Sequence, residues 1–131
     1  AIRLRESIYR IFAAIAAGDP APAVDLAAFN GFLAATRPFE RLIQQDAGYA
    51  WDRTVDPQRL DSILSPLLRS AVELLVSPEV GRVKRCGDPA CGWLFLDTSR
   101  NGSRRWCDMR DCGNRAKASR FYRKKKGLKS V

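Results

Sequence analysis

The four cysteines of this chain fall into two pairs whose spacing is suited to binding a metal ion. Cys86 and Cys91 enclose four residues, Cys107 and Cys112 enclose another four, and fifteen residues separate the pairs. Two short loops of this kind can bring four thiolates to one ion, which completes the tetrahedral shell of a structural Zn²⁺ and leaves no open position for water. We therefore favour one structural zinc. Two disulfides, four free thiols and an iron–sulfur cluster are the alternatives.

Residue types around the cysteines favour metal binding over catalysis. The chain has no histidine, which excludes Ser-His-Asp and Cys-His catalytic pairs and any histidine-ligated metal. Gly92 and Gly113 each follow the second cysteine of a pair, where glycine allows a sharp turn that directs backbone N–H groups toward sulfur. Nearby basic side chains should favour the thiolate form. They are Lys84, Arg85, Arg105 and Arg110.

The charge of the chain is divided unequally between its two parts. Among 131 residues, 23 are Lys or Arg and 14 are Asp or Glu, which gives a formal net charge of +9. Residues 1–80 hold eight basic and ten acidic residues, whereas residues 81–131 hold fifteen basic and four acidic ones together with all the cysteines. This asymmetry indicates a polyanionic partner for the second part. We expect one domain over 1–81 and another over 82–131.

The segments around the cysteines predict a treble-clef-like zinc finger with a β-hairpin and a C-terminal helix. Between the pairs, Asn101-Gly102 follows a β-prone run and predicts the turn of the hairpin. A helix is predicted from about Gly113 to Lys125, with Cys112 at its start, where the helix dipole stabilises a thiolate. Because so short a module cannot build a large apolar core, zinc would supply much of its folding free energy.

Helical geometry divides this last predicted helix into two faces. Ala118, Phe121 and Tyr122 share one face with Asn114 and are expected to pack on the aromatic side chains of the hairpin. The opposite face is basic, which is typical of nucleic-acid binding; a solvated face with a disordered tail is the alternative. The candidate nucleic-acid-binding residues are Arg100, Arg104, Arg105, Arg115, Lys117, Arg120, Arg123 and Lys124.

The first part of the chain predicts a mainly α domain. Apolar residues recur at helical spacing over residues 3–17 and 22–36, and a small β-hairpin is predicted within residues 39–53. The strongest helical pattern covers residues 60–75, where Pro66 either kinks the helix or starts a new one. We interpret the apolar stripes as core. No Gly/Ser-rich linker follows them, so the finger is expected to lie close to the helical part.

Two stretches of the sequence resemble known families. The run from Cys107 through Cys112-Gly-Asn-Arg115 resembles the CGNR zinc finger, and the run from Cys86 to Asn101 is similar to the first half of that finger, so the resemblance covers 82–125. Ser65–Leu75 resembles the last helix of the ABATE domain, which usually precedes this finger. The resemblance implies that the four cysteines are zinc ligands and that the finger binds DNA. It also implies a stress-induced transcription regulator of bacteria, in a family whose members usually carry a further stretch before the first helix.

These observations lead to a ranked set of functional hypotheses. The first is a cytoplasmic regulator that binds double-stranded DNA through its finger and binds a small-molecule effector, or forms a homodimer, through its helical domain. An RNA- or ribosome-associated zinc protein and a protein-interaction module stapled by zinc are the alternatives. An enzyme is least favoured. No membrane partner is expected, because the longest uncharged stretch, 26–36, is far shorter than the roughly 20 apolar residues that span a bilayer.

Overall fold

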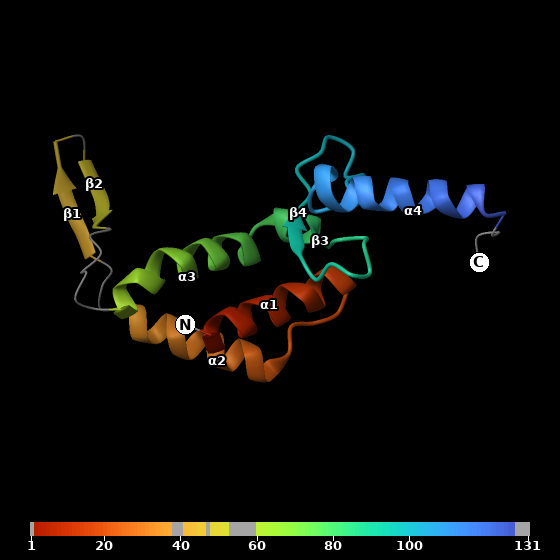
Figure 1. Ribbon diagram of the computed structural model, residues 1–131. Helices are drawn as coiled ribbons and strands as arrows, with labels where there is room; N and C mark the ends of the chain where they lie inside the picture. The colour runs from red at the N-terminus through yellow and green to blue at the C-terminus, as the bar shows by residue number, and fades with distance from the viewer. Residues whose placement is uncertain (1, 38–40, 47, 53–59, 128–131) are drawn as a thin grey trace.

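The computed structural model describes residues 2–37, 41–46, 48–52 and 60–127. Its first part contains the helices α1 (Ile2–Ala17), α2 (Ala23–Thr36) and α3 (Leu60–Val76), which pack together in Figure 1. The bounds of α1 and α2 confirm the helices predicted from apolar periodicity. Gly18 ends α1 with a φ of +83°, a left-handed conformation that glycine adopts without steric cost.

Apolar side chains from all three helices form the core. Leu4 and Ile11 of α1, Phe29 of α2 and Leu68 of α3 are each at most 2% exposed. Val83, at the start of the second part, joins the same cluster. The apolar stripes of the sequence therefore pack as core, as predicted, and the core extends into the beginning of the finger.

Pro66 lies inside α3, which runs without a break from Leu60 to Val76. Of the two alternatives for Pro66, the start of a new helix at this proline is therefore wrong. Proline removes one backbone hydrogen bond, but Leu68 and Ala71 are buried in the core and hold the following turns in helical conformation. A short 3₁₀ helix, η2 (Pro78–Arg82), connects α3 to the second part.

The predicted hairpin within residues 39–53 is confirmed as two antiparallel strands, β1 (Arg41–Gln45) and β2 (Gly48–Asp52). Their register places Leu42 opposite Trp51. Residues 39, 40, 47 and 53 of the prediction lie outside the described residues. The hairpin stands at the opposite end of the molecule from the C-terminal helix (Figure 1).

The hairpin of the finger lies elsewhere than predicted. Its strands are β3 (Val83–Arg85) and β4 (Leu94–Leu96), which pair antiparallel and enclose the first cysteine loop. Asn101-Gly102 does form a turn, with a φ of +62° at Gly102, but the described residues 103–106 form no strand. The reason is that β4 pairs with β3, while hydrogen bonds to the Asp97 side chain hold the chain after the turn.

The last helix, α4 (Asn114–Lys125), follows a single π-helical turn, η3 (Met109–Gly113), that contains Cys112. It confirms the predicted C-terminal helix, but its packing differs from the prediction. Phe121 is 64% exposed and Tyr122 is 63% exposed, and they contact each other edge to face rather than the hairpin. α4 leaves the finger after its first turns and projects away from α1–α3 (Figure 1). These aromatic rings therefore lie too far along the helix to pack on the hairpin.

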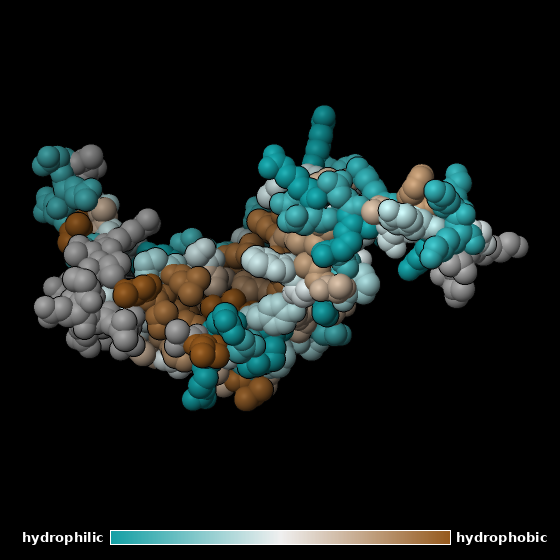
Figure 2. Space-filling view, in the orientation of Figure 1, coloured by the Kyte–Doolittle hydropathy of each residue, from teal (hydrophilic) through white to brown (hydrophobic). Residues whose placement is uncertain are grey.

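The finger packs directly against the helical part, as expected from the short connection. β3, β4 and η2 all contact α1, and the Tyr9 hydroxyl donates a hydrogen bond of 2.9 Å to the Gly92 carbonyl. Figure 2 shows apolar side chains gathered over α1–α3 and hydrophilic ones over α4 and the finger loops. Among the described helices, none has the length and apolar character needed to cross a bilayer.

Candidate metal centre and nucleic-acid interface

The two cysteine loops bring all four thiols together at one point. The sulfur atoms of Cys86, Cys91, Cys107 and Cys112 lie within 4.8 Å of one another, and all four are free of disulfides. Cys107 Sγ lies 3.7 Å from both Cys91 Sγ and Cys112 Sγ. Four sulfurs bound tetrahedrally at about 2.3 Å from Zn²⁺ lie about 3.8 Å apart, so this donor set fits one zinc ion.

Backbone hydrogen bonds fix the two loops relative to each other. The Cys86 N–H donates to the Trp93 carbonyl at 2.9 Å and closes the first loop across the β3–β4 hairpin. The Gly87 N–H donates to the Arg105 carbonyl at 2.8 Å, which ties the first loop to the segment that leads into the second. η3 then supplies Cys112 at the start of α4. The β3–β4 pairing, rather than a hairpin between the cysteine pairs, therefore positions the first two ligands.

The glycines after each pair have a different role from the one predicted. Neither Gly92 nor Gly113 has a positive φ; Gly113 is right-handed, with a φ of −64°. A Cβ atom at Gly113 would lie 2.5 Å from the Met109 sulfur, and one at Gly92 would lie 3.5 Å from the Tyr9 hydroxyl. Gly113 therefore makes no sharp turn; a side chain there would only require the exposed Met109 side chain to move.

The four thiols perturb the pKa values of one another strongly. Burial opposes ionisation of Cys86, but backbone N–H groups of Cys107 and Asp88 and the neighbouring thiols lower its pKa to about 7. Burial and the neighbouring thiols raise the pKa of Cys112 to about 12, and burial also raises the pKa of Cys107. Four thiolates cannot share this space without a compensating positive charge, which is what a divalent metal ion supplies.

Arg115 is the basic side chain that contacts a sulfur. Its Nη2 donates to Cys112 Sγ at 3.2 Å, and its Nε donates to Asp88 Oδ2 at 2.7 Å. Asp88 is buried in the first cysteine loop. Arg115 belongs to α4, so its contacts with Asp88 and Cys112 connect this loop to the helix beside the metal centre. Sequence reasoning placed Arg115 with the nucleic-acid contacts and missed Asp88. The contact between Arg115 and the Cys112 sulfur could have been predicted, because residues three apart lie on the same side of a helix.

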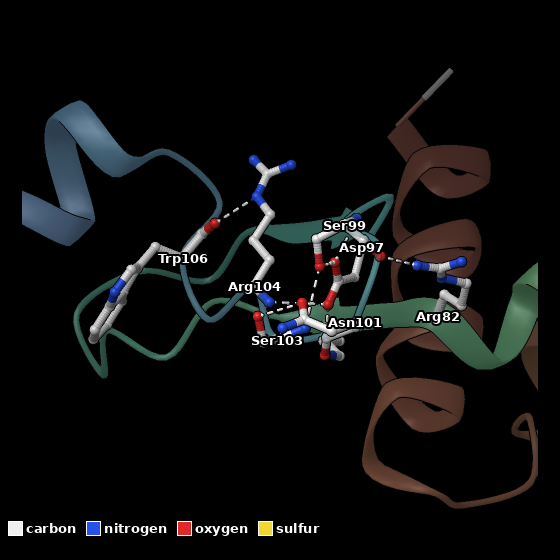
Figure 3. A network of polar contacts seen from close by, with 9 residues as sticks. Arg82, Asp97, Ser99, Asn101, Ser103, Arg104 and Trp106 are labelled. Atoms are coloured by element: carbon white, nitrogen blue, oxygen red, sulfur yellow. Dashed lines mark hydrogen bonds and ion pairs between the residues drawn. The ribbon is translucent and has the colours of Figure 1, made fainter.

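A second network, around Asp97, holds the chain between the cysteine pairs (Figure 3). Asp97 is fully buried and accepts hydrogen bonds from the Ser99 and Arg104 backbone N–H groups and from the Ser99 hydroxyl. The Lys84 ammonium, 2.6 Å away, is the largest cause of a strongly lowered pKa for the Asp97 carboxyl. Lys84, which the sequence placed beside the thiols, therefore neutralises this carboxylate. Sequence reasoning did not identify Asp97.

The other candidate nucleic-acid residues are all exposed, but two of them also contact groups of the finger. The Arg104 guanidinium lies 4.7 Å from the centre of the Phe95 ring and donates to the Trp106 and Cys107 carbonyls. The Arg105 guanidinium lies 5.4 Å from the centre of a Trp106 ring. The remaining five are exposed. They are Arg100 on the turn and Lys117, Arg120, Arg123 and Lys124 on α4.

A helical domain joined to a finger with four clustered cysteines defines the chain as a zinc-finger protein. Residues 82–125 match the family model of the CGNR zinc finger. Residues 1–78 match the ABATE family, which is described as "Putative stress-induced transcription regulator". Because this second match covers more than half of the chain, the protein belongs to the ABATE family, and its CGNR finger holds four cysteines positioned to bind one structural zinc. No curated protein matches the chain.

Proposed function

We propose that this protein is a cytoplasmic transcription regulator that binds double-stranded DNA through residues 82–131, while residues 1–81 sense a signal or mediate assembly. The observation that carries the proposal is the character of α4. Six of its twelve residues are Lys or Arg, none is acidic, and none is buried. A basic helix on a metal-anchored base, projecting from the molecule, offers its side chains to a phosphate backbone.

Selection of bound sequences from random duplex DNA tests this function most directly, since it reports the kind of nucleic acid and the specificity together. Binding to a selected duplex should weaken steeply with salt. A log–log slope of about −4 to −7 is expected if about five to eight phosphates are neutralised. Failure to enrich any duplex, or a salt-insensitive complex, would count against DNA binding.

RNA binding is the second candidate, and the exposed aromatic side chains favour it. Phe121 and Tyr122 lie among basic residues on α4 without a covering partner in the described part of the chain. Exposed aromatic rings beside arginines can stack on unpaired bases. Titrating duplex DNA, structured RNA and single-stranded RNA at one salt concentration separates the two functions, and replacing Phe121 by leucine should weaken only binding that depends on stacking.

For the helical part, we propose an effector site in the groove between α1, the end of α3 and the β3–β4 hairpin. The groove has a volume of about 770 Å³ and is lined mainly by apolar and aromatic side chains, including Phe12, Leu74 and Trp93. That volume lies within the usual range for small-molecule sites. A ligand there should change the fluorescence of Trp93, and the change should disappear in a Trp93→Phe variant. If residues 1–81 act through a homodimer instead, sedimentation equilibrium should report twice the monomer mass.

A further inference from the structure

Four arginines from two separate segments line one groove between the first cysteine loop and α4. Arg105 precedes the third cysteine, whereas Arg115, Arg120 and Arg123 belong to α4. The groove, here called the arginine notch, has a volume of about 360 Å³ and is also lined by Ser119 and Trp106. Arg115, Ser119 and Arg123 recur every four residues, so they follow one line along the helix.

The notch carries a net positive charge that its own residues do not neutralise. Its acidic residue, Asp88, is already paired with Arg115 at 2.7 Å. Among the described residues, none of the ion pairs involves Arg105, Arg120 or Arg123. Three of the four arginines that line this groove therefore keep a charge that is available to an anionic ligand.

Two contacts restrict how these guanidinium groups move. Arg105 lies against the half-buried Trp106 ring, 5.4 Å from its centre, and Arg120 Nε donates to the Ala116 carbonyl of its own helix at 3.4 Å. At the base of the notch, the Arg115–Asp88 pair joins α4 to the cysteine loop. The Gly87 N–H also donates to the Arg105 carbonyl, so the two segments that carry the arginines are both tied to this cysteine loop.

We propose that the arginine notch binds the phosphate backbone of duplex DNA and so fixes how α4 lies on it, a proposal that rests on the DNA-binding function proposed above. Guanidinium groups bind phosphate oxygens in bidentate fashion, and the Ser119 hydroxyl adds a donor in the same line. Phosphate contacts position a protein on the duplex without reading its sequence. The notch therefore contributes affinity and orientation, equally for every sequence.

The first test compares two variants that remove equal charge from α4. The Arg120→Gln/Arg123→Gln variant alters the notch, and the Lys125→Gln/Lys126→Gln variant alters the end of the helix. Fluorescence anisotropy with the zinc-loaded chain should show about tenfold or greater loss of affinity for the notch variant. Its salt slope should become shallower by about two. Equal losses in both variants would overturn the proposal.

The second test uses the arginine that does not belong to α4. Arg105→Gln should weaken duplex binding severalfold, whereas Lys126→Gln, which removes the same charge from an exposed position just after α4 and outside the notch, should change it little. Zinc content and melting temperature should stay unchanged in these variants, because their side chains are exposed. Equal effects at the two positions would show that binding follows total charge and would overturn the notch.

A third measurement separates failure of the notch from failure of the proposed function. Inorganic pyrophosphate, titrated into the zinc-loaded chain, should shift the Nε–H nuclear magnetic resonance signals of Arg105, Arg120 and Arg123. Absence of these shifts overturns the notch even if duplex DNA binds. Shifts in a chain that binds no duplex would leave the notch as a site for small phosphate anions, but they would overturn both the DNA-binding function and the role of the notch on duplex DNA.

Discussion

The two parts of this chain are stabilised by different interactions. The buried side chains of α1–α3 are mainly apolar, and their packing forms one core. In the finger beyond Val83, the buried side chains among the described residues belong to two cysteines and two aspartates, Cys86, Cys112, Asp88 and Asp97. The helical part therefore depends on removing apolar surface from water, whereas the finger depends on a cation and on hydrogen bonds to charged groups.

The same contrast holds for charge. Residues 1–80 hold eight basic against ten acidic residues, while residues 81–131 hold fifteen against four. One Zn²⁺ bound by four thiolates adds about −2 to the finger, which leaves it at about +9. The like charges of this module repel one another, and its small apolar core does little to offset that repulsion. A bound anion would reduce it. The helical part thus supplies the apolar core, and the finger supplies the positive charge that, in the proposed function, attracts a polyanion.

Removing the metal should have the largest effect, because it should unfold the finger and leave the helical part folded. Structural zinc contributes about 10–16 kcal/mol of apparent binding free energy in small fingers, so a strong chelator should unfold the region after Val83. Circular dichroism should lose the α4 contribution, while nuclear magnetic resonance signals of Leu4 and Ile11 persist. Metal analysis should find about one zinc per chain before treatment. A metal-free chain with an intact finger would contradict this account.

The converse change should damage the helical part and spare the metal centre. Leu68 is fully buried in α3, so Leu68→Ala should lower the free energy of unfolding by about 2–5 kcal/mol. Its neighbour Leu67 is 52% exposed, and Leu67→Ala should change stability by about 0.5 kcal/mol or less. Urea unfolding measures both. Zinc should stay bound at the urea concentration that unfolds the helical part of the Leu68 variant, and simultaneous loss of zinc would contradict the difference between the two parts.

Within the finger, Asp97→Asn should cost more than any change of an exposed acidic residue. The amide keeps the shape of the side chain but removes the charge that faces the Lys84 ammonium and replaces one acceptor oxygen with a donor. The melting temperature should fall and zinc should be lost to a competing chelator sooner. Asp111→Asn, at an exposed position, is the matched control. Equal behaviour of the two variants would show that the Asp97 network is dispensable.

Arg115→Lys should weaken zinc retention while the finger stays folded. Lysine keeps the charge but cannot contact Cys112 Sγ and Asp88 at once, because it lacks the planar fork of donors. Loss of such a supporting contact typically costs about 10- to 100-fold in metal affinity. Competition with a chromophoric chelator measures the change. Lys117→Arg, on the same helix, should leave affinity unaltered, and an equal loss there would remove Arg115 from the metal centre.

Much of the fold and the metal-binding residues could be predicted, because their signals are local. Apolar periodicity identifies α1, α2 and α3, since core packing imposes a fixed spacing on each helix. The two C-x4-C pairs identify the thiol cluster, since few other roles require that spacing. Both signals lie within a few residues of the feature that they predict.

The errors concern partners that lie far apart in the chain. Asn101-Gly102 forms its turn, but nothing in the local pattern shows that β4 pairs with a three-residue strand before Cys86. The position of Phe121 depends on the direction in which α4 leaves the finger, which the sequence of the helix does not encode. Arg115 contacts Asp88, which lies 27 residues earlier in the chain, so no local pattern indicates this pair. Each of these follows from tertiary packing rather than local propensity.

The smallest expected effect tests the contact between the two parts. The Tyr9 hydroxyl donates to the Gly92 carbonyl at 2.9 Å and thereby connects α1 to the segment after Cys91. Tyr9→Phe should cost about 1 kcal/mol or less, since one hydrogen bond at a partly exposed position is exchanged for water. Tyr49→Phe, on the distant β1–β2 hairpin at a position 72% exposed, is the control and should change nothing.

The readout for Tyr9→Phe must follow each part separately. In a chain loaded with Co²⁺, the absorption of the metal–thiolate centre reports the finger, while circular dichroism reports mainly the helices. The substitution should lower the melting temperature of the finger more than that of the helices, because the core loses no apolar packing when a hydroxyl is removed. Equal shifts of both transitions would mean that the finger and the helices unfold as one unit. The packing of Val83 in the helical core would then couple the unfolding of the two parts, although different interactions stabilise each of them.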